Sequence, residues 1–362
     1  FTISAAAPVA SNTTATVPDG TAGNTTNISI TVLDQFDNPV SGQSGNLTVT
    51  VTGSNSVSPS VTESGTQGVY TTSYTPTVAG TDNIAINLSG SPISGSPFTS
   101  QVTTSDINAS NSSVTPNPAT LQVGSSSTVT VEVRDGSGNP IGGLAGTAFS
   151  INLSGAAVAG SVSETATAGT YQFTVSNQTA QSVTVTVTAD GVTLDDTPSI
   201  TFEPGGVSIV GIQTQPGESV AGESITGPPL VRLIDEFGNR VPGVDITVSE
   251  QSGQSFAGGT LTRVSNASGE ASFTDLVITG AGSYNLVFTA SGQIGTSAAF
   301  NVVPAAADPA QTTASVPGGS AGDPTTITIT VEDAFGNRVT GVAGNLAVSV
   351  SGANAGATVQ TI

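Results

Sequence analysis

Several short runs of the chain alternate between β-branched or other apolar residues and Thr, Ser or Asn. The clearest runs cover residues 27–32, 47–51, 183–187 and 327–331. A period of two with β-branched residues predicts strands that bury one face and expose the other. No stretch sustains a period of 3.6 residues, and 44 glycines with 20 prolines would interrupt most helices. We therefore expect an all-β protein with negligible α-helix.

The chain repeats itself about every hundred residues. The segment Asp34–Asn38 (DQFDN) returns as Asp135–Asn139 (DGSGN), Asp235–Asn239 (DEFGN) and Asp333–Asn337 (DAFGN). The leading aspartates lie 98 to 101 residues apart. A period of that size is one small domain per repeat, so we expect a string of like modules rather than one large globule.

Clusters of Pro and small residues between strands place the module boundaries. We expect modules at 5–104, 105–204, 205–304 and 305–362, with 1–4 as the end of an upstream domain. Short strands bounded by turn residues predict an immunoglobulin-like antiparallel sandwich of about seven strands in each module, in an elongated tandem array. The fourth module is little more than half a sandwich. We therefore expect the natural polypeptide to continue beyond Ile362, or another chain to supply the missing strands.

The composition argues against most enzymes. The chain has no Cys, His, Trp or Met, and its five basic residues are all Arg. It therefore lacks a histidine-based triad, a thiolate or imidazole metal site and a Schiff-base lysine. A net charge of −20 repels nucleic acid and anionic lipid. No apolar run approaches the ~18–20 residues of a membrane helix. We expect no catalytic or cofactor-binding residues, no nucleic-acid partner and no direct membrane insertion in this segment.

The repeated segments resemble a known signature. Asp235–Gly243 (DEFGNRVPG) and its sister segments resemble the D-x-F-G-N-P-V-x-G pattern of bacterial immunoglobulin-like repeats, including those of invasin- and intimin-type adhesins. The first module also resembles a filamin-type repeat, over Gly68–Pro76 (GVYTTSYTP) and Ile93–Phe98 (ISGSPF). The second module departs from the pattern, with Ser137 in place of Phe. The resemblance implies a surface stalk, adhesin or scaffold and names no ligand.

The repeated Asp–Asn segment has two interpretations. Asp, Asn and Gly favour a turn between strands, and Phe36, Phe237 and Phe335 would then plug the ends of the cores. Alternatively, oxygens of Asp34, Asp37 and Asn38 would bind calcium. We favour the turn, because so few carboxylates fall short of the 6–8 ligands that calcium prefers.

Two further groups of residues invite a functional interpretation. Asp195, Asp196 and Glu203 lie near a module boundary, where calcium could stiffen a stalk; we favour solvated loop carboxylates. Tyr70, Tyr171 and Tyr284 could stack on sugars; we favour buried rings whose hydroxyls bond to backbone.

The sequence allows more than one interpretation of the uncharged strand edges and offers many possible sites for glycans. The strands at Val183–Thr188 and Asn46–Thr52 carry no charge, so their edges are either covered or meet other chains in a fibre. Sequons for N-linked glycans begin at Asn12, Asn24, Asn27, Asn46, Asn87, Asn108, Asn111, Asn152, Asn177 and Asn266. Ser and Thr offer sites for O-linked glycans.

Together these observations predict a non-enzymatic prokaryotic structural protein. We expect it at the cell surface or in the extracellular space, as a stalk or as a filament subunit that associates with itself. Two alternatives are a ligand-binding adhesin segment and a spacer in a large exported hydrolase.

Overall fold

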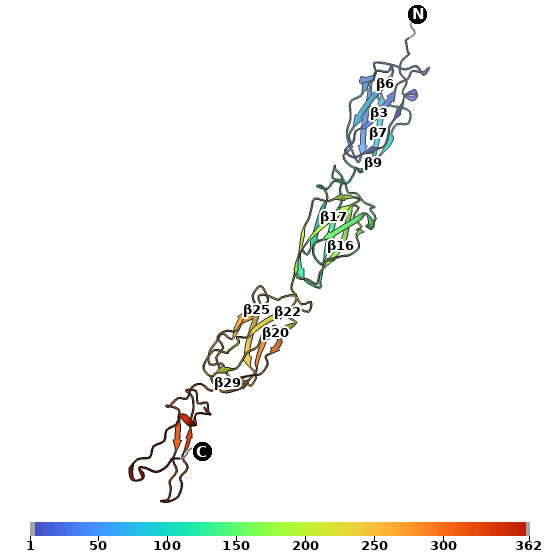
Figure 1. Ribbon diagram of the computed structural model, residues 1–362. Helices are drawn as coiled ribbons and strands as arrows, with labels where there is room; N and C mark the ends of the chain where they lie inside the picture. The colour runs from blue at the N-terminus through green and yellow to red at the C-terminus, as the bar shows by residue number, and fades with distance from the viewer. Residues whose placement is uncertain (1–3, 360–362) are drawn as a thin grey trace. The chain divides into compact units, whose positions relative to one another are not determined.

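The computed structural model describes residues 4–359, and strands dominate it (Figure 1). The only helices among these residues are short 3-10 turns: η1 (Ala10–Asn12), η2 (Ser44–Asn46), η3 (Gly146–Ala148), η4 (Ala343–Asn345) and η5 (Gly352–Asn354). No helix in this part of the chain has the length and apolar character needed to cross a membrane. The all-β fold expected from the alternating pattern is confirmed. Of residues 1–4, the expected end of an upstream domain, the first three lie outside the described residues.

The first sandwich has two sheets. One has the order β1 (Thr14–Thr16), β3 (Thr26–Thr31), β6 (Val69–Tyr74), β5 (Thr62–Glu63). The other has the order β2 (Gly20–Thr21), β9 (Phe98–Thr103), β7 (Gly80–Leu88), β4 (Leu47–Gly53), with β8 (Ser91–Pro92) beside β7. Alternate residues of both sheets, such as Ile30 and Ile84, are fully buried between them.

The second sandwich repeats this plan. One sheet has the order β10 (Ser113–Asn117), β12 (Ser126–Glu132), β16 (Thr170–Ser176), β14 (Val158–Ala159), with β15 (Ser163–Glu164) also on β16. The other has the order β11 (Thr120–Gln122), β19 (Ser199–Glu203), β17 (Gln181–Ala189), β13 (Phe149–Leu153), with β18 (Val192–Thr193) on β17. Val131 and Val185 are the fully buried counterparts of Ile30 and Ile84.

The third sandwich has three smaller sheets. They are β20 (Ile209–Thr214), β22 (Leu230–Ile234), β25 (Glu270–Ser272); β21 (Ser219–Val220), β29 (Phe300–Val303), β26 (Gly282–Tyr284); and β24 (Thr262–Val264), β23 (Asp245–Glu250), β27 (Leu286–Ala290), β28 (Gln293–Thr296). Beyond it, the described residues contain one hairpin, β30 (Thr313–Ser315) with β31 (Thr328–Thr330). The chain divides into two compact units, Phe1–Glu203 and Pro204–Ile362. The four module boundaries themselves stay predictions.

The sandwiches are not purely antiparallel, which corrects one expectation. In each, a short early strand pairs in parallel with the last strand: β2 with β9, β11 with β19, and β21 with β29. Pro18, Pro118 and Pro216 stand just before these early strands. Proline has no N–H to donate, so it ends the first ladder, and the chain crosses to the other sheet.

The uncharged strands expected as edges differ from one another. Val183–Thr188 belongs to β17, which lies between β19 and β13 and is therefore not an edge. Asn46–Thr52 falls largely on β4, which does end its sheet. There Val51 and Val57 exchange backbone hydrogen bonds of 2.8 and 3.2 Å, so a loop covers part of that edge. Strand order depends on distant parts of the chain, and the absence of charge does not reveal it.

Candidate functional site

The repeated Asp–Asn segment forms the same turn four times, and the aspartate organises it. In the first turn, Asp34 Oδ1 accepts hydrogen bonds from the backbone N–H groups of Phe36 (2.8 Å) and Asn38 (2.9 Å). Asp34 Oδ2 accepts from the N–H of Ala6 (2.8 Å), at the start of the module. The Asn38 amide also donates to both carboxylate oxygens. The carboxylate therefore holds both the turn and the incoming linker.

The other three turns reproduce this arrangement. Asp135, Asp235 and Asp333 each accept from the N–H groups two and four residues later, at 2.8–2.9 Å. Each also accepts from a linker N–H, that of Ser105, Gly205 and Ala305 respectively, at 2.9–3.1 Å. All four aspartates are at most 1% exposed. The repeated motif is thus a staple that fixes the entry of the chain into each module.

These hydrogen bonds stabilise the charged carboxylate. Burial acts to raise the pKa of Asp34, but the hydrogen bonds from Asn38, Ala6 and Phe36 outweigh it and lower the pKa from 3.8 to about 2. The same balance between burial and N–H donors lowers the pKa values of Asp135, Asp235 and Asp333. The four staples are therefore ionised at neutral pH.

The donors around Asp34 favour the structural interpretation of the turn over the calcium site. Both oxygens of Asp34 face N–H groups, which a cation would have to displace. Asp37 Oδ1 accepts from the amide of Asn12 at 3.2 Å. Asp196 and Glu203 do not converge either, because Asp196 precedes β19 and Glu203 is its last residue, and the four residue steps of this strand span about 13 Å. Among residues 4–359, no group of three or more acidic side chains is placed to hold a metal ion.

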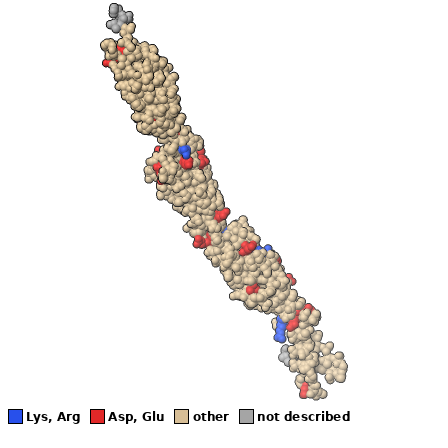
Figure 2. Space-filling model, turned by 180° about the vertical axis from the view of Figure 1, so that it is seen from behind, with Lys and Arg blue, Asp and Glu red and all other residues tan. Residues whose placement is uncertain are grey.

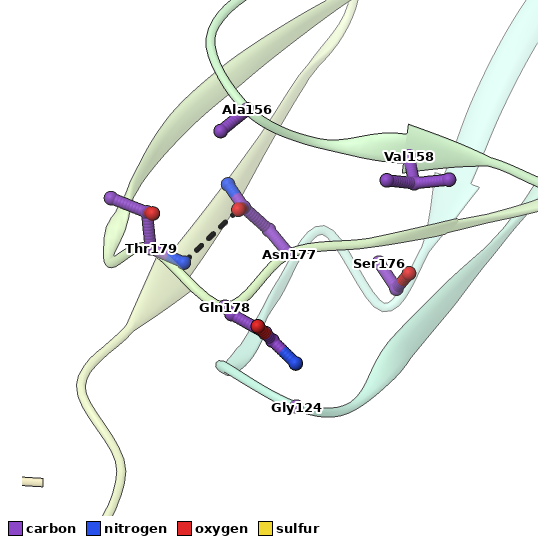
Figure 3. A pocket seen from close by; sticks show the side chains of 7 residues that line it. All are labelled: Gly124, Ala156, Val158, Ser176, Asn177, Gln178 and Thr179. Atoms are coloured by element: carbon purple, nitrogen blue, oxygen red, sulfur yellow. Dashed lines mark hydrogen bonds between the residues drawn. The ribbon is translucent and has the colours of Figure 1, made fainter. Parts of the chain in front are cut away.

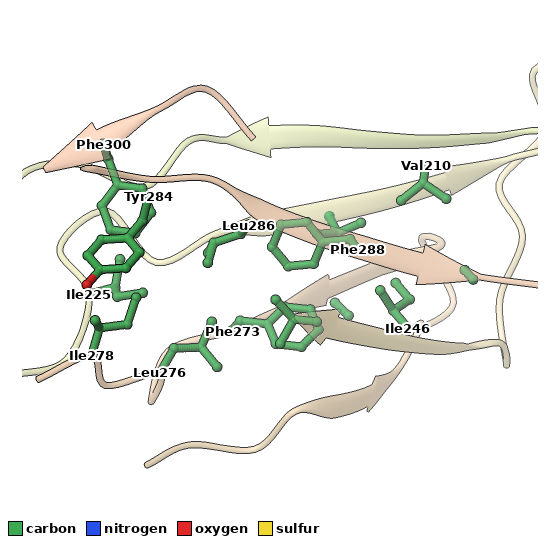
Figure 4. Close-up of a cluster of buried hydrophobic side chains, with 14 of the residues drawn as sticks. Val210, Ile225, Ile246, Phe273, Leu276, Ile278, Tyr284, Leu286, Phe288 and Phe300 are labelled. Atoms are coloured by element: carbon green, nitrogen blue, oxygen red, sulfur yellow. The ribbon is translucent and has the colours of Figure 1, made fainter. Parts of the chain in front are cut away.

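The expectation that Phe36, Phe237 and Phe335 plug the cores is wrong. Phe36 is 69% exposed and Phe335 is 48% exposed. Phe237 is half-buried but lies outside the core of the third sandwich. That core contains Phe273 and Phe288 instead, whose ring centroids are 5.2 Å apart (Figure 4). The aspartate occupies the inner side of the turn, so the residue two positions later is left on the outside.

The asparagine at the end of the turn joins neighbouring modules. Within the first compact unit, Asn139 Nδ2 donates to Thr77 O (2.9 Å) and Asn139 Oδ1 accepts from Ala79 N (3.2 Å). Within the second, Asn337 makes the same pair of bonds to Thr279 O (2.7 Å) and Ala281 N (2.7 Å). In both cases the amide bridges a carbonyl and an N–H two residues apart, at the loop before β7 or β26. We call this arrangement the asparagine clasp.

A glycine lies beside each clasp. Gly222 has a φ of +82°, and a Cβ there would collide with the ring of Phe335. Gly23 has a φ of +83°, and a Cβ there would come within 3.3 Å of Ser137 Oγ. These glycines therefore suit a left-handed backbone and leave room for the outward residue of the next turn. The Phe that was expected in a core instead contacts the preceding sandwich.

The tyrosines have the buried positions expected for them. Tyr70 and Tyr171 are fully buried; their hydroxyls donate to Val40 O (2.7 Å) and Ile141 O (2.9 Å). The same hydroxyls accept from the N–H groups of Gln43 and Leu144. Burial raises the pKa of both hydroxyls. Tyr284 is 7% exposed and donates to Gly280 O (2.9 Å), so none of the three offers a stacking platform.

One repeated carboxylate escaped the sequence analysis. Glu63 Oε2 accepts from Gly42 N, and Glu164 Oε2 accepts from Gly143 N, both at 2.9 Å. Hydrogen bonds from backbone N–H groups, that of Gly42 for Glu63 and that of Gly169 for Glu164, lower the pKa of each. Both glutamates stand seven residues before a buried tyrosine, and this shared spacing was the available signal.

Charged side chains are sparse and do not gather into a patch on the face that Figure 2 shows. Three of the arginines pair locally, Arg134 with Glu132, Arg232 with Glu270 and Arg263 with Asp275. These pairs neutralise cations that could otherwise attract an anionic ligand. The surface of the described residues is mainly Ser, Thr, Asn and small apolar side chains.

One pocket of about 380 Å³ lies in the second sandwich (Figure 3). Its lining residues are Gly124, Ala156, Val158, Ser176, Asn177, Gln178 and Thr179. None of them carries a charge, and the Asn177 side chain is tied to Thr179 N at 3.0 Å. The pocket therefore offers neither an acid nor a base for catalysis.

Comparisons with known proteins agree with this architecture. Residues 101–205 match the family model for invasin, domain 3, and residues 7–99 match that for the filamin/ABP280 repeat. The invasin match covers the very module that carries Ser137 in place of Phe. A comparison with curated protein sequences found no match.

Two solved structures share the fold. One is the Escherichia coli adhesin FdeC, with 21% identity and a TM-score of 0.50, over 84% of this chain and 100% of the other. The second is invasin, a bacterial integrin-binding protein, with 18% identity and a TM-score of 0.50, over 81% of this chain and 60% of the other. The protein is thus a tandem array of immunoglobulin-like domains, similar to bacterial adhesin repeats and, in its first module, to a filamin repeat.

Proposed function

We propose that this protein is a non-enzymatic structural protein of the prokaryotic cell surface or extracellular space. Its tandem sandwiches would form a stalk or the subunit of a filament. The observation that carries the proposal is the asparagine clasp, which recurs with the same partners in both compact units. Each clasp adds two hydrogen bonds to a junction at which free relative motion of the modules is otherwise expected, so it would reduce bending of a stalk.

Three further observations support this role. The buried carboxylates are engaged by N–H donors, so none of them is free to act as an acid or a base. The second module matches the model of invasin domain 3, and FdeC is described as an adhesin. Each sandwich has its own core, so length can be added module by module.

Electron microscopy of the native material tests the proposal. Ordered fibres would identify a filament subunit, and single thin projections from cells would identify a stalk. Brief proteolysis of intact cells should release fragments of this chain. Recovery of the intact protein only from the interior of lysed cells would contradict a surface role.

A ligand-binding adhesin segment is the second candidate, and one surface feature favours it. Ile209 and Ile294 are 52% and 64% exposed, on the strands β20 and β28. Exposed apolar side chains of this size can contribute to a binding surface. Replacing both by Ser should then abolish attachment of cells to their target and leave the folding of the third sandwich unchanged.

A further inference from the structure

The first module has in its Asp34–Asn38 turn the same parts as the turns that meet a preceding sandwich. Its turn has the same staple as the others, because Asp34 makes the same hydrogen bonds as Asp333. The backbone that presents Phe36 and Asn38 is therefore fixed in the same way as the backbone that presents Phe335 and Asn337.

The side chains on this turn are exposed. Phe36 is the most exposed of the large apolar residues among those described, at 69%. Asn38 is exposed as well, whereas its counterpart Asn139 is 7% exposed in its clasp. The amide of Asn38 donates to Asp34, and its Oδ1 has no hydrogen-bond donor within the described part of the chain.

We infer that the Asp34–Asn38 turn is a docking surface for the end of another immunoglobulin-like module. The two occupied joints define the chemistry of that partner. It must offer a carbonyl and an N–H two residues apart, as Thr279 and Ala281 do, to receive the amide of Asn38. It must also offer a left-handed glycine, as Gly222 does, against which the ring of Phe36 packs.

The partner is a module placed in line ahead of the first sandwich. Two hydrogen bonds and one ring make a small contact, so attachment through a linker is needed to raise the effective concentration. The linker geometry is already present, because the N–H of Ala6 donates to Asp34 as that of Ala305 donates to Asp333, with a sequence separation of 28 in both pairs. This inference concerns module contacts alone and does not depend on where the protein resides.

A chimera tests the inference. Residues 205–304, which contain nearly the whole core of the third sandwich, are placed directly before residues 6–362, so that Ala6 takes the place of Ala305. The chain has no Trp, so Phe36→Trp introduces a single tryptophan on the turn, which can be excited apart from the four tyrosines at wavelengths where they do not absorb. We expect its emission to move to shorter wavelength and its quenching by acrylamide to fall in the chimera, relative to the unextended chain.

Two matched variants complete this measurement. Phe335→Trp in the unextended chain gives the emission wavelength and acrylamide quenching of an indole that contacts a preceding sandwich. Adding Asn38→Ala to the Phe36→Trp chimera should return the indole emission toward that of the unextended chain. Identical emission and quenching with and without the added module would overturn the inference. So would a shift in the unextended chain that grows with protein concentration, because it would place a second copy on the turn.

A second experiment leaves Phe36 in place, so it does not depend on whether the larger indole ring of Phe36→Trp fits the joint. The chain has no Cys, so Asn38→Cys can be combined with Thr279→Cys in the added module alone. We expect oxidation to form an intramolecular disulfide, as it should for Asn337→Cys with Thr279→Cys in the unextended chain. Docking would be refuted if the Asn337→Cys and Thr279→Cys pair formed a disulfide in the unextended chain while the Asn38→Cys and Thr279→Cys pair formed none in the chimera.

Discussion

At the scale of single residues, the four aspartates decide how each turn responds to acid. Their pKa values are lower in the folded protein than the ordinary 3.8, so they stabilise the fold above about pH 4. This stabilisation is lost as the pH falls through the folded pKa, which for Asp34 is about 2. We expect urea midpoints to be constant from pH 7 to about pH 4.5 and to drop between pH 4 and pH 2.

Asp34→Asn should weaken that acid response in the first sandwich. The amide keeps one acceptor oxygen but presents an N–H toward the N–H of Ala6, so stability at pH 7 should fall. Amide hydrogen exchange in β3 and β6 measures the effect. The inference about the staple fails if wild type and variant show the same decline between pH 4 and pH 2.

The exposed Phe36 and the buried Ile30 form a matched pair within one sandwich. Phe36→Ala should change the free energy of unfolding of the unextended chain by less than about 0.5 kcal/mol, as is usual for surface positions. Ile30→Ala should cost about 2–5 kcal/mol, because it empties a fully buried site. Urea denaturation followed by tyrosine fluorescence distinguishes the two variants. If both lost the same free energy of unfolding, Phe36 would contribute to the core as Ile30 does.

At the scale of elements, the buried tyrosines tie a strand to the loop that follows another strand. Tyr70 in β6 donates to Val40 and accepts from Gln43, both in the loop between β3 and β4. Tyr70→Phe removes both bonds and leaves the buried carbonyl of Val40 and the partly buried N–H of Gln43 unpaired, so it should cost about 1–3 kcal/mol. Thr71→Ser, on the exposed face of the same strand, is the control. A Tyr70→Phe protein as stable as this control would show that water replaces the hydroxyl.

The sequence predicted these elements well where the cause is local. Alternating Ile and Thr predicted the strands, and the sandwich fold that they predict favoured buried tyrosine rings whose hydroxyls bond to backbone. It failed where the cause lies elsewhere in the chain. Nothing within Val183–Thr188 shows that β13 covers its edge, and nothing within Asp333–Asn337 shows that Phe335 meets Gly222. A turn at the end of a sandwich can face its own core or a neighbouring module, and only the tertiary arrangement decides.

At the scale of the whole molecule, the clasp should couple adjacent modules. Asn139→Ala leaves Thr77 O and Ala79 N without their partner, so the Ala79 amide should exchange with solvent markedly faster. Asn38→Ala is the matched control, since the Asn38 amide donates to Asp34 within the first module and does not bond to Ala79, and it should leave Ala79 unchanged. Equal exchange at Ala79 in the wild type and Asn139→Ala would show that the clasp does not hold the junction.

The parallel pairing of a short early strand with the last strand of each sandwich has a mechanical consequence. When a sandwich is pulled by its two ends, β2 and β9 are drawn in opposite directions along their common axis. Their hydrogen bonds then carry the load together, in shear, whereas a hairpin pulled open at its ends breaks its bonds one after another. The same holds for β11 with β19 and for β21 with β29. Tension along the chain therefore loads sets of hydrogen bonds that must break together. Each sandwich has its own set, so the sandwiches should resist tension independently and unfold one at a time.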